Sequence, residues 1–265
     1  MTFTCPTTSR RSAEAPHAGA AQLRRYGGDV TRLDEAAWPG IPNQPLLLVP
    51  LGSTEQHGPH LPFTVDAVIA ETVTRSAGER LGAVVAPVLT YGSSGEHQQF
   101  AGTLSIGQDA LRLLLVELVR SARTWTARVV FVTGHGGNAP VLSEVVPTMR
   151  AEGHDVVWLG LEPPVDSPLR DAHAGRIETS LMLHLAPDRV GDFSEVHGST
   201  APLTELMPTL RAVGVRAVSP TGVLGDPRDA TQAEGKELLQ VLIDDVVARV
   251  ELFDANDRGE LRRQT

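Results

Sequence analysis

Short apolar runs alternate with longer segments of helical periodicity along most of the chain. The expected strands are residues 45–53, 83–89, 128–133 and 155–161. The expected helices are residues 67–81, residues 108–126, a segment that begins near Pro140, and residues 230–252. Continuous apolar strands separated by helices are typical of a parallel sheet that is covered on both faces. The pattern therefore predicts an α/β fold with a mainly parallel sheet.

The same pattern delimits the expected domain. Residues 1–25 carry charged and small side chains without core-facing periodicity, and we expect a flexible tail there. Residues 26–254 contain every expected strand and helix and are predicted to form one domain. Within it, residues 213–229 resemble loops with one short strand at most. Residues 255–265 are polar, and we expect them to form a tail that frays.

Composition narrows the possible functions. The 265 residues are 41% hydrophobic with a mean hydropathy of -0.07, which is typical of a globular protein. No apolar run approaches the roughly 20 residues that span a bilayer, so we expect no membrane contact. The formal net charge of -9 without a basic block argues against nucleic acid as a partner. Cys5 is the only cysteine, which excludes a disulfide framework and indicates a cytoplasmic protein.

Each expected strand is followed by histidine or carboxylate side chains. In chain order these are Glu55 and His57, Glu96 and His97, His135, and Asp171 and His173. In open α/β sheets the reactive groups collect just beyond the carboxyl ends of the strands, so the four clusters should meet at one edge. Their coincidence indicates a metal or acid–base site.

The segment GSTEQHGPHLPFTVD, residues 52–66, is the richest of these clusters. Glu55 and His57 are two residues apart, so an extended backbone turns both side chains the same way. Asp66 follows a proline-containing turn that can fold back toward them. The alternative interpretation is that Asp66 caps the next helix and that the histidines, His60 included, are only exposed polar residues.

The segment TGHGGN, residues 133–138, supplies a second candidate imidazole, that of His135. Gly136 and Gly137 let a ligand approach the backbone closely. The segment lacks the glycine spacing of nucleotide-binding loops, so a nucleotide is not expected.

The segment DAHAGRIETS, residues 171–180, completes the candidate site. His173 and Glu178 are five residues apart, which is roughly 140° around an ideal helix, so one regular helix cannot turn both inward. We therefore expect His173 in a loop and Glu178 in the first or second helical turn. A plain loop histidine and an acid that favours the helix dipole are the alternatives.

The charges of the candidate ligands favour two divalent ions over one. Glu55, Asp66 and Glu178 together carry -3 and two divalent ions carry +4, which leaves +1 for one bridging hydroxide to neutralise. Without metal, three neighbouring carboxylates would repel one another and take up protons. Paired ions about 3.5–4 Å apart activate water and polarise a carbonyl. The chain contains neither the G-x-S-x-G motif of serine hydrolases nor the H-E-x-x-H motif of zincins, so neither mechanism is expected.

Four motifs, GSTEQHGPHLPFTVD, GEHQQFAGT, TGHGGN and HAGRIETS, resemble the creatininase (creatinine amidohydrolase) family in order and spacing, across about residues 45–250. The resemblance implies a three-layer α/β/α sandwich, a binuclear metal site and a homo-oligomer, commonly a hexamer. The stretches YGSSGEHQQFAGTLSIG and AVSPTGVLGDPRDATQAEG are most similar to the branch of the family that trims the modified mycofactocin precursor peptide. That branch implies this peptide as the substrate, with release of a fragment built from its terminal Val-Tyr pair.

The resemblance also implies the metal ligands. One ion would be held by Glu55, Asp66 and His135, and the other by His57 and the bridging Asp66. Creatininase has a glutamate two residues after the motif histidine, where this chain has Gly137. Glu178 is therefore the candidate for the last ligand. Two imidazoles and three carboxylates suit Zn²⁺, Fe²⁺ and Mn²⁺.

Other roles follow from the resemblance and from general chemistry. His173 matches the family's catalytic histidine, which would pass a proton to the leaving nitrogen. The backbone N–H groups of Gly136 and Gly137 are expected to stabilise the oxyanion. Glu96 and His97 are expected to face the substrate.

Three hypotheses compete at this point. The first is a peptidase, because the loop at residues 162–172 has no aromatic side chains to wall a creatinine-like ring. The second is hydrolysis of a small cyclic amide or a formamide with the same metals. The third is a metal-dependent binding protein for a peptide, which would have no use for the proton shuttle that His173 offers.

Overall fold

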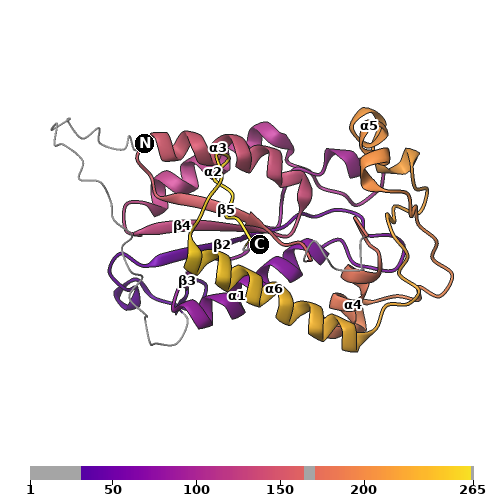
Figure 1. Cartoon of the computed structure of the whole chain (residues 1–265), viewed down its shortest axis with the longest axis horizontal. Coiled ribbons are helices and arrows are strands. Elements are labelled where there is room, and N and C mark those ends of the chain that lie inside the picture. The colour runs from indigo at the N-terminus through magenta and orange to yellow at the C-terminus, as the bar shows by residue number, and fades with distance from the viewer. Residues whose placement is uncertain (1–30, 164–170, 264–265) are drawn as a thin grey trace.

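The computed structural model describes residues 31–163 and 171–263 (Figure 1). Its strands are β1 (Thr31–Arg32), β2 (Leu46–Leu51), β3 (Val84–Val85), β4 (Arg128–Thr133) and β5 (Val156–Gly160). They form one sheet in the order β1-β3-β2-β4-β5, and every pair is parallel. This sheet confirms the predicted fold class. The tail expected over residues 1–25 lies outside the described residues.

The described residues form six α-helices around the sheet and beyond its strand ends. They are α1 (Val65–Leu81), α2 (Gly107–Ala122), α3 (Ala139–Ala151), α4 (Arg176–Leu185), α5 (Leu203–Val213) and α6 (Gln232–Leu252). The 3₁₀ helices are η1 (Trp38–Gly40), η2 (Gly95–His97), η3 (Gly136–Asn138), η4 (Pro187–Arg189) and η5 (Val215–Ala217). Helices α2 and α3 cover one face, α1 and α6 cover the other, and α4 and α5 lie beyond the carboxyl ends of the strands (Figure 1). The result is the expected three-layer sandwich.

Side chains of β2 alternate between the two layers of the core. Leu46 and Leu48 pack with residues of α1, α4 and α6, whereas Leu47, Val49 and Leu51 pack with α2 and α3. Both sets are almost completely buried, because helices cover both faces of a parallel sheet. In the part of the chain that the structure describes, no helix is both long and apolar enough to cross a membrane.

Several boundaries differ from the sequence prediction. Helix α1 begins at Val65, two residues early, which places Asp66 in its first turn instead of in a loop. The strand expected over residues 83–89 is only two residues long, with one further bridge at Leu89. Residues 213–229 hold η5 and no strand of the described sheet. Helix α5 was not predicted, although its apolar residues recur at helical spacing; Pro208 interrupts the pattern, and Leu210 is its only buried residue.

The prediction that the chain frays after Asp254 is wrong for the described residues 255–263. Leu261 is 1% exposed and belongs to the core, and its backbone N–H donates to the carbonyl oxygen of Trp158. The buried guanidinium of Arg249 in α6 donates to the carbonyl oxygens of Leu261 and Gly160. The apolar side chain and the backbone pairing outweigh the polar composition of this segment.

Candidate metal centre

Close packing between strand ends and α1 brings the first ligands together. Strands β2 and β4 pair from Leu46–Leu51 to Arg128–Thr133, so their carboxyl ends stop at the same level. Gly52 follows β2, and a Cβ at this position would lie 2.5 Å from the backbone of Ala67 in α1. Only glycine permits this approach. It sets the start of α1, with Asp66, against the segment that follows β2.

The two central carboxylates are buried, and three of their four oxygens lack a hydrogen-bond partner among the described residues. Glu55 is 0% exposed and Asp66 is 2% exposed. Neither Glu55 oxygen has a hydrogen-bond partner among the described residues, and neither does Oδ2 of Asp66. Burial of a carboxylate without donors is costly, so such groups are normally paired or bind a metal. This donor set fits a divalent cation.

His57 and His135 each turn one ring nitrogen to a backbone carbonyl. Nδ1 of His57 lies 3.1 Å from the carbonyl oxygen of Glu55, and Nε2 of His135 lies 3.0 Å from that of Ser93. A carbonyl only accepts, so those nitrogens carry the ring protons. Histidines that bind metals are typically held in this way.

The other nitrogen of each ring faces the carboxylates. Nε2 of His57 lies 3.1 Å from Oδ1 of Asp66 and 3.8 Å from Oε2 of Glu178. Nδ1 of His135 lies 3.2 Å from Oε2 of Glu55 and 3.4 Å from Oδ2 of Asp66. Asp66 therefore stands between the two imidazoles, one on each of its oxygens. This is the geometry of a carboxylate that could bridge two ions.

The electrostatics of the cluster are dominated by burial and by these carboxylates. Burial opposes a charge on His57, but Asp66 and Glu178 outweigh it and raise the pKa of His57 to about 10. Glu55 outweighs burial in the same way and raises the pKa of His135 to about 10. Burial and the Glu55 charge raise the pKa of Asp66 to about 6. Protons on the imidazoles balance negative charge that a cation would also balance.

His173 and Glu178 occupy the positions that their spacing indicates. His173 lies in the loop before α4, and Glu178 lies in the first turn of α4. Oε2 of Glu178 accepts a hydrogen bond of 2.5 Å from the backbone N–H of Ala174. Burial and the nearby His57 lower the pKa of His173 to about 4.

Three overlapping groups of side chains place one candidate ligand atom each within 4.8 Å of one another. The groups are Glu55, His57 and Asp66; His57, His173 and Glu178; and Glu55, His97 and His173. Proximity alone does not make each group a metal site, because a ligand nitrogen must be free of its proton. The orientation of each ring therefore decides which groups can act.

Gly137 does not leave room for the creatininase glutamate. A Cβ at this position would lie 2.3 Å from Nε2 of His135, 2.5 Å from the carbonyl oxygen of Ser93 and 2.7 Å from Oε1 of Glu96. A side chain here would displace the His135 ring from its hydrogen bond. Glu96 itself is one-third exposed, with Oε1 3.7 Å from Nε2 of His135, so it lies on the outer side of that ring.

Two residues of the polar clusters point away from the carboxylates. Oδ2 of Asp171 accepts a hydrogen bond of 3.1 Å from the backbone N–H of Ile177, at the start of α4. Nε2 of His60 lies 2.9 Å from the hydroxyl of Thr179, also in α4. Both contacts fix α4 and its preceding loop. These contacts account for the positions of Asp171 and His60, so neither residue needs a chemical role.

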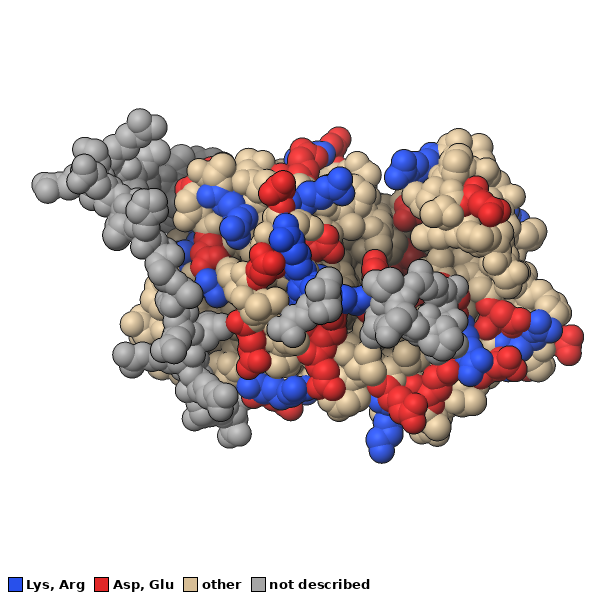
Figure 2. Space-filling view, in the orientation of Figure 1, with Lys and Arg blue, Asp and Glu red and all other residues tan. Residues whose placement is uncertain are grey.

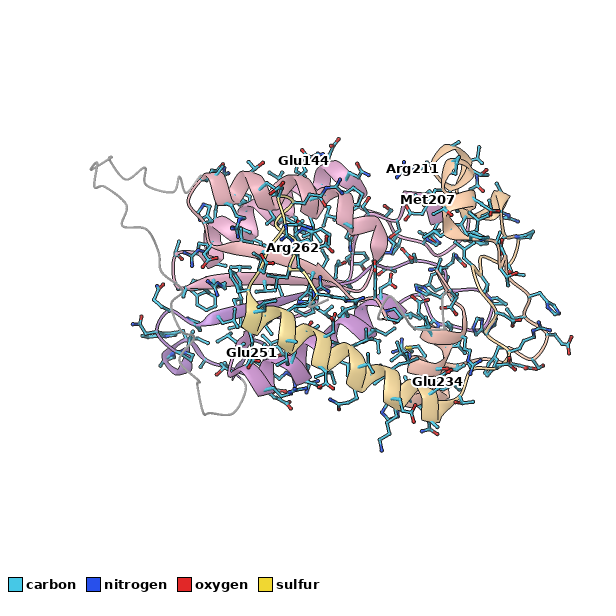
Figure 3. All side chains as sticks on the ribbon, in the orientation of Figure 1. Glu144, Met207, Arg211, Glu234, Glu251 and Arg262 are labelled. Carbon is cyan, nitrogen blue, oxygen red and sulfur yellow. The ribbon has the colours of Figure 1, made fainter. Side chains whose placement is uncertain are left out.

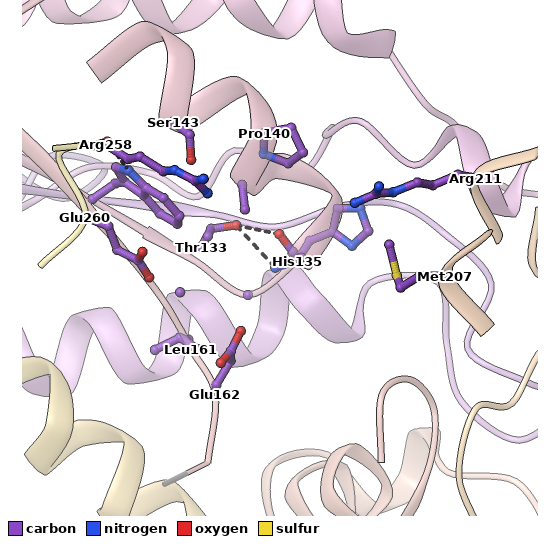
Figure 4. Close-up of a pocket in the computed structure, with 15 residues that line it drawn as sticks. Thr133, His135, Pro140, Ser143, Leu161, Glu162, Met207, Arg211, Arg258 and Glu260 are labelled. Carbon is purple, nitrogen blue, oxygen red and sulfur yellow. Dashed lines mark hydrogen bonds between the residues drawn. The ribbon is translucent and has the colours of Figure 1, made fainter. Parts of the chain in front are cut away.

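A cavity of about 510 Å³ adjoins His135 on the side of β5 (Figure 4). It is lined by Thr133, Gly134, His135, Gly136, Ala139, Pro140, Ser143, Trp158, Gly160, Leu161, Glu162, Met207, Arg211, Arg258 and Glu260. Met207 and Arg211 come from α5, on the side that faces the rest of the domain (Figure 3). Arg211 points toward His135 (Figure 4), and the surface is hollowed beside α5 (Figure 2). The cavity could hold part of an extended ligand next to the cluster.

Known proteins resemble this chain over most of its length. The chain matches the family described as Creatininase: Creatinine amidohydrolase over residues 34–250. A relative named mycofactocin precursor peptide peptidase, from Mycolicibacterium smegmatis, is 49% identical over 223 residues, which cover 82% of this chain and 89% of the relative.

Solved creatininases share the fold. A mutant creatininase of Zn-Zn type and a creatininase designated Mn each have a TM-score of 0.69 and 26% identity, over 85% of this chain and 99% of theirs. These metal forms, together with the buried donor set, support divalent metal binding here. The match over residues 34–250 covers most of the chain. This protein therefore belongs to the creatininase (creatinine amidohydrolase) family and is a metal-dependent hydrolase.

Proposed function

We propose that this protein is a peptidase that hydrolyses one amide bond near the C-terminus of the modified mycofactocin precursor peptide. The product is the crosslinked fragment derived from the terminal Val-Tyr pair. The reaction type rests on one observation, the buried Glu55 and Asp66 carboxylates faced by Nε2 of His57 and Nδ1 of His135. The substrate rests on the name of the relative that is 49% identical.

We assign two divalent ions to this cluster. Glu55, Asp66 and His135 would hold one ion, and His57, Asp66 and Glu178 would hold the other. The contacts of Asp66 with both imidazoles and of Glu178 with His57 support this division. Zn²⁺ and Fe²⁺ are the proposed metals, and Mn²⁺ has the same ligand preferences. When bound, such a pair supplies activated water and a polarised carbonyl.

The remaining roles belong to the protein's own groups. His173 would pass a proton to the leaving nitrogen, and its Nδ1, 3.6 Å from Oε1 of Glu55, supports this role. Gly136 lines the cavity, and its N–H, with that of Gly137, would stabilise the oxyanion. Glu96, at the edge of the cluster, would contact the peptide.

The cavity suits an extended peptide better than a small ring. Its lining mixes apolar side chains with the guanidinium groups of Arg211 and Arg258. Trp158 also lines the cavity. It lies in β5, however, and only 4% of its surface is exposed. A ring-binding site would need more accessible aromatic surface. We further propose a cytoplasmic homo-oligomer, a hexamer as in the family, with one core domain that includes the segment 255–263.

Mass spectrometry of the precursor peptide tests the function. Zn²⁺- or Fe²⁺-loaded enzyme should cleave the modified peptide and release the small fragment, and the unmodified peptide should react more slowly because it loses more freedom on binding. Asp66→Asn should abolish cleavage, whereas Asp155→Asn, at the opposite edge of the sheet, should not. Turnover of creatinine or a formamide with neither peptide cleaved would replace the proposal with the small-amide alternative.

A further inference from the structure

The side-chain amide of Gln56 has an unambiguous orientation. Gln56 lies between the candidate ligands Glu55 and His57 and is 5% exposed. Its Oε1 lies 2.9 Å from the backbone nitrogen of Gly58, which can only donate. Its Nε2 lies 3.0 Å from the carbonyl oxygen of Gly222, which can only accept. Two backbone groups therefore fix which end of the amide is oxygen and which is nitrogen.

The second proton of this amide can serve only one of two nearby rings. Nε2 of Gln56 lies 2.8 Å from Nδ1 of His97 and 3.0 Å from Nε2 of His173. Nε2 of His173 also lies 2.6 Å from the backbone carbonyl oxygen of Gln56, so it donates its own proton there. A nitrogen that carries a proton cannot accept one. The free amide proton of Gln56 therefore goes to Nδ1 of His97.

The two rings consequently present opposite groups to Glu55. His173 has its proton on Nε2, so its unprotonated Nδ1 faces Oε1 of Glu55 at 3.6 Å. His97 accepts at Nδ1, so its neutral ring carries the proton on Nε2, which lies 3.3 Å from the same oxygen, close enough for electrostatic attraction but without a hydrogen bond to it. One ring offers a lone pair and the other offers a proton. The rings are adjacent, with centroids 4.4 Å apart.

We propose that Gln56 is a positioning residue that holds His97 with its protonated Nε2 facing Glu55 and so keeps His97 out of the metal coordination. The group formed by Glu55, His97 and His173 is then no metal site, although its atoms are close enough to be one. His97 instead orients Glu55, while His173 keeps a nitrogen free for proton transfer. This assignment rests on the proposed hydrolytic function only for the role of His173.

Metal content tests the inference without any substrate. His97→Ala, in the full chain loaded with Zn²⁺, should retain the wild-type number of ions at saturation. Its affinity in chelator competition should fall about 10–100-fold, as expected when a residue that orients a ligand is lost. His135→Ala is the matched control and should lose at least one ion. Loss of an ion from His97→Ala at saturating Zn²⁺ would overturn the proposal.

The protonation of His97 gives a second, spectroscopic test. Long-range ¹H–¹⁵N spectra of Zn²⁺-loaded, ¹⁵N-histidine-labelled protein should show His97 as the neutral ring protonated at Nε2, with its signals identified by their loss in His97→Ala. Gln56→Glu keeps an acceptor for Gly58 but removes the donor, so the His97 ring should gain a proton at Nδ1. A wild-type ring already protonated at Nδ1 would contradict the proposal.

Turnover separates this inference from the proposed function. If the precursor peptide is the substrate, Gln56→Glu should lower kcat about 10-fold or more with KM nearly unchanged, because Gln56 lies behind the ligands. The isosteric Gln56→Met should give the same loss while keeping the fold. If no peptide is cleaved by the wild type but the metal counts and spectra are as expected, the substrate is wrong and the role of Gln56 stands.

Discussion

Backbone carbonyls select the free nitrogen of each imidazole in this site. The carbonyl oxygen of Glu55 accepts a hydrogen bond from Nδ1–H of His57, and that of Ser93 accepts one from Nε2–H of His135. A side-chain acceptor could rotate or change its protonation, whereas a backbone carbonyl is fixed by the fold. Ring orientation is thus set before any ion binds, which lowers the ordering cost of binding.

The raised histidine pKa values predict proton release on metal binding. His57 and His135 have pKa values of about 10, so both rings are protonated at pH 7 in the metal-free protein. A ligand nitrogen must be deprotonated, so each ion that binds displaces protons and its apparent affinity rises with pH up to about pH 10. Calorimetry at pH 7 in buffers of different ionisation enthalpy should detect one to two protons released per ion pair.

A ring outside the cluster provides the control for this measurement. His154 precedes β5, at the opposite edge of the sheet, and His154→Ala should release the same number of protons as the wild type. His135→Ala should release fewer. Metal affinity that is constant between pH 6 and pH 9 would contradict the assignment of these two imidazoles as ligands.

The residues that carry the site could be listed from sequence, but their orientations could not. Glu55, His57 and Asp66 stand out because their residue types are unusual after an apolar strand. Gln56 and Ser93 leave no such signal, because an amide and a backbone carbonyl are common everywhere. Their roles depend on which ring lies within hydrogen-bond distance, and only the packed loops decide that.

At the scale of elements, burial explains why the apolar pattern predicted the central strands and why it did not predict the docked C-terminal segment. Strands β2 and β4 are continuous apolar runs because both of their faces are covered, and their bounds were predicted to within two residues. Helix α5 carries apolar residues at helical spacing, but Pro208 interrupts them and only Leu210 is buried, so the helix was overlooked. The segment 255–263 contributes a single core side chain, that of Leu261, which is too little for periodicity to detect.

That single side chain predicts a large loss of stability. Leu261→Ala should destabilise the fold by about 2–5 kcal/mol, because the residue is 1% exposed and truncation leaves a cavity. Chemical denaturation at fixed metal concentration measures the change. Leu113→Ala is the matched control, since Leu113 is 64% exposed and its truncation should change stability by less than about 0.5 kcal/mol. Equal losses in both variants would show that the C-terminal segment does not dock.

Helix α5 carries the next prediction through Arg211. Its guanidinium lines the cavity and has no ion-pair partner among the described residues, so it is available to a carbonyl or carboxylate of the substrate. Arg211→Glu should raise KM roughly 10-fold, about 1.4 kcal/mol of binding, with kcat nearly unchanged. Arg120→Glu, on α2 and paired with Glu117 and Glu152, is the control and should leave KM unaltered. An unchanged KM in Arg211→Glu would remove α5 from the substrate site.

At the scale of the whole molecule, the cluster ties the separate layers together. Glu55 follows β2, Asp66 begins α1, His135 follows β4, and His173 and Glu178 flank the start of α4. Buried carboxylates that lack donors cost free energy in the metal-free fold. The two proposed ions, whose ligands together come from all of these elements, should therefore stabilise the entire domain and not only its loops.

Removal of metal should accordingly lower the melting temperature. An ion that binds only the folded state at about 1,000 times its Kd contributes roughly 4 kcal/mol, which for a domain of this size corresponds to about 10 °C. Calorimetric scans before and after chelation would show this shift, and added Zn²⁺ should restore it. Asp66→Asn should melt at one temperature with or without chelator, because the residue that contacts both imidazoles is lost. If chelation did not change the melting temperature of the wild-type protein, the charges of the carboxylates would be balanced by protons alone.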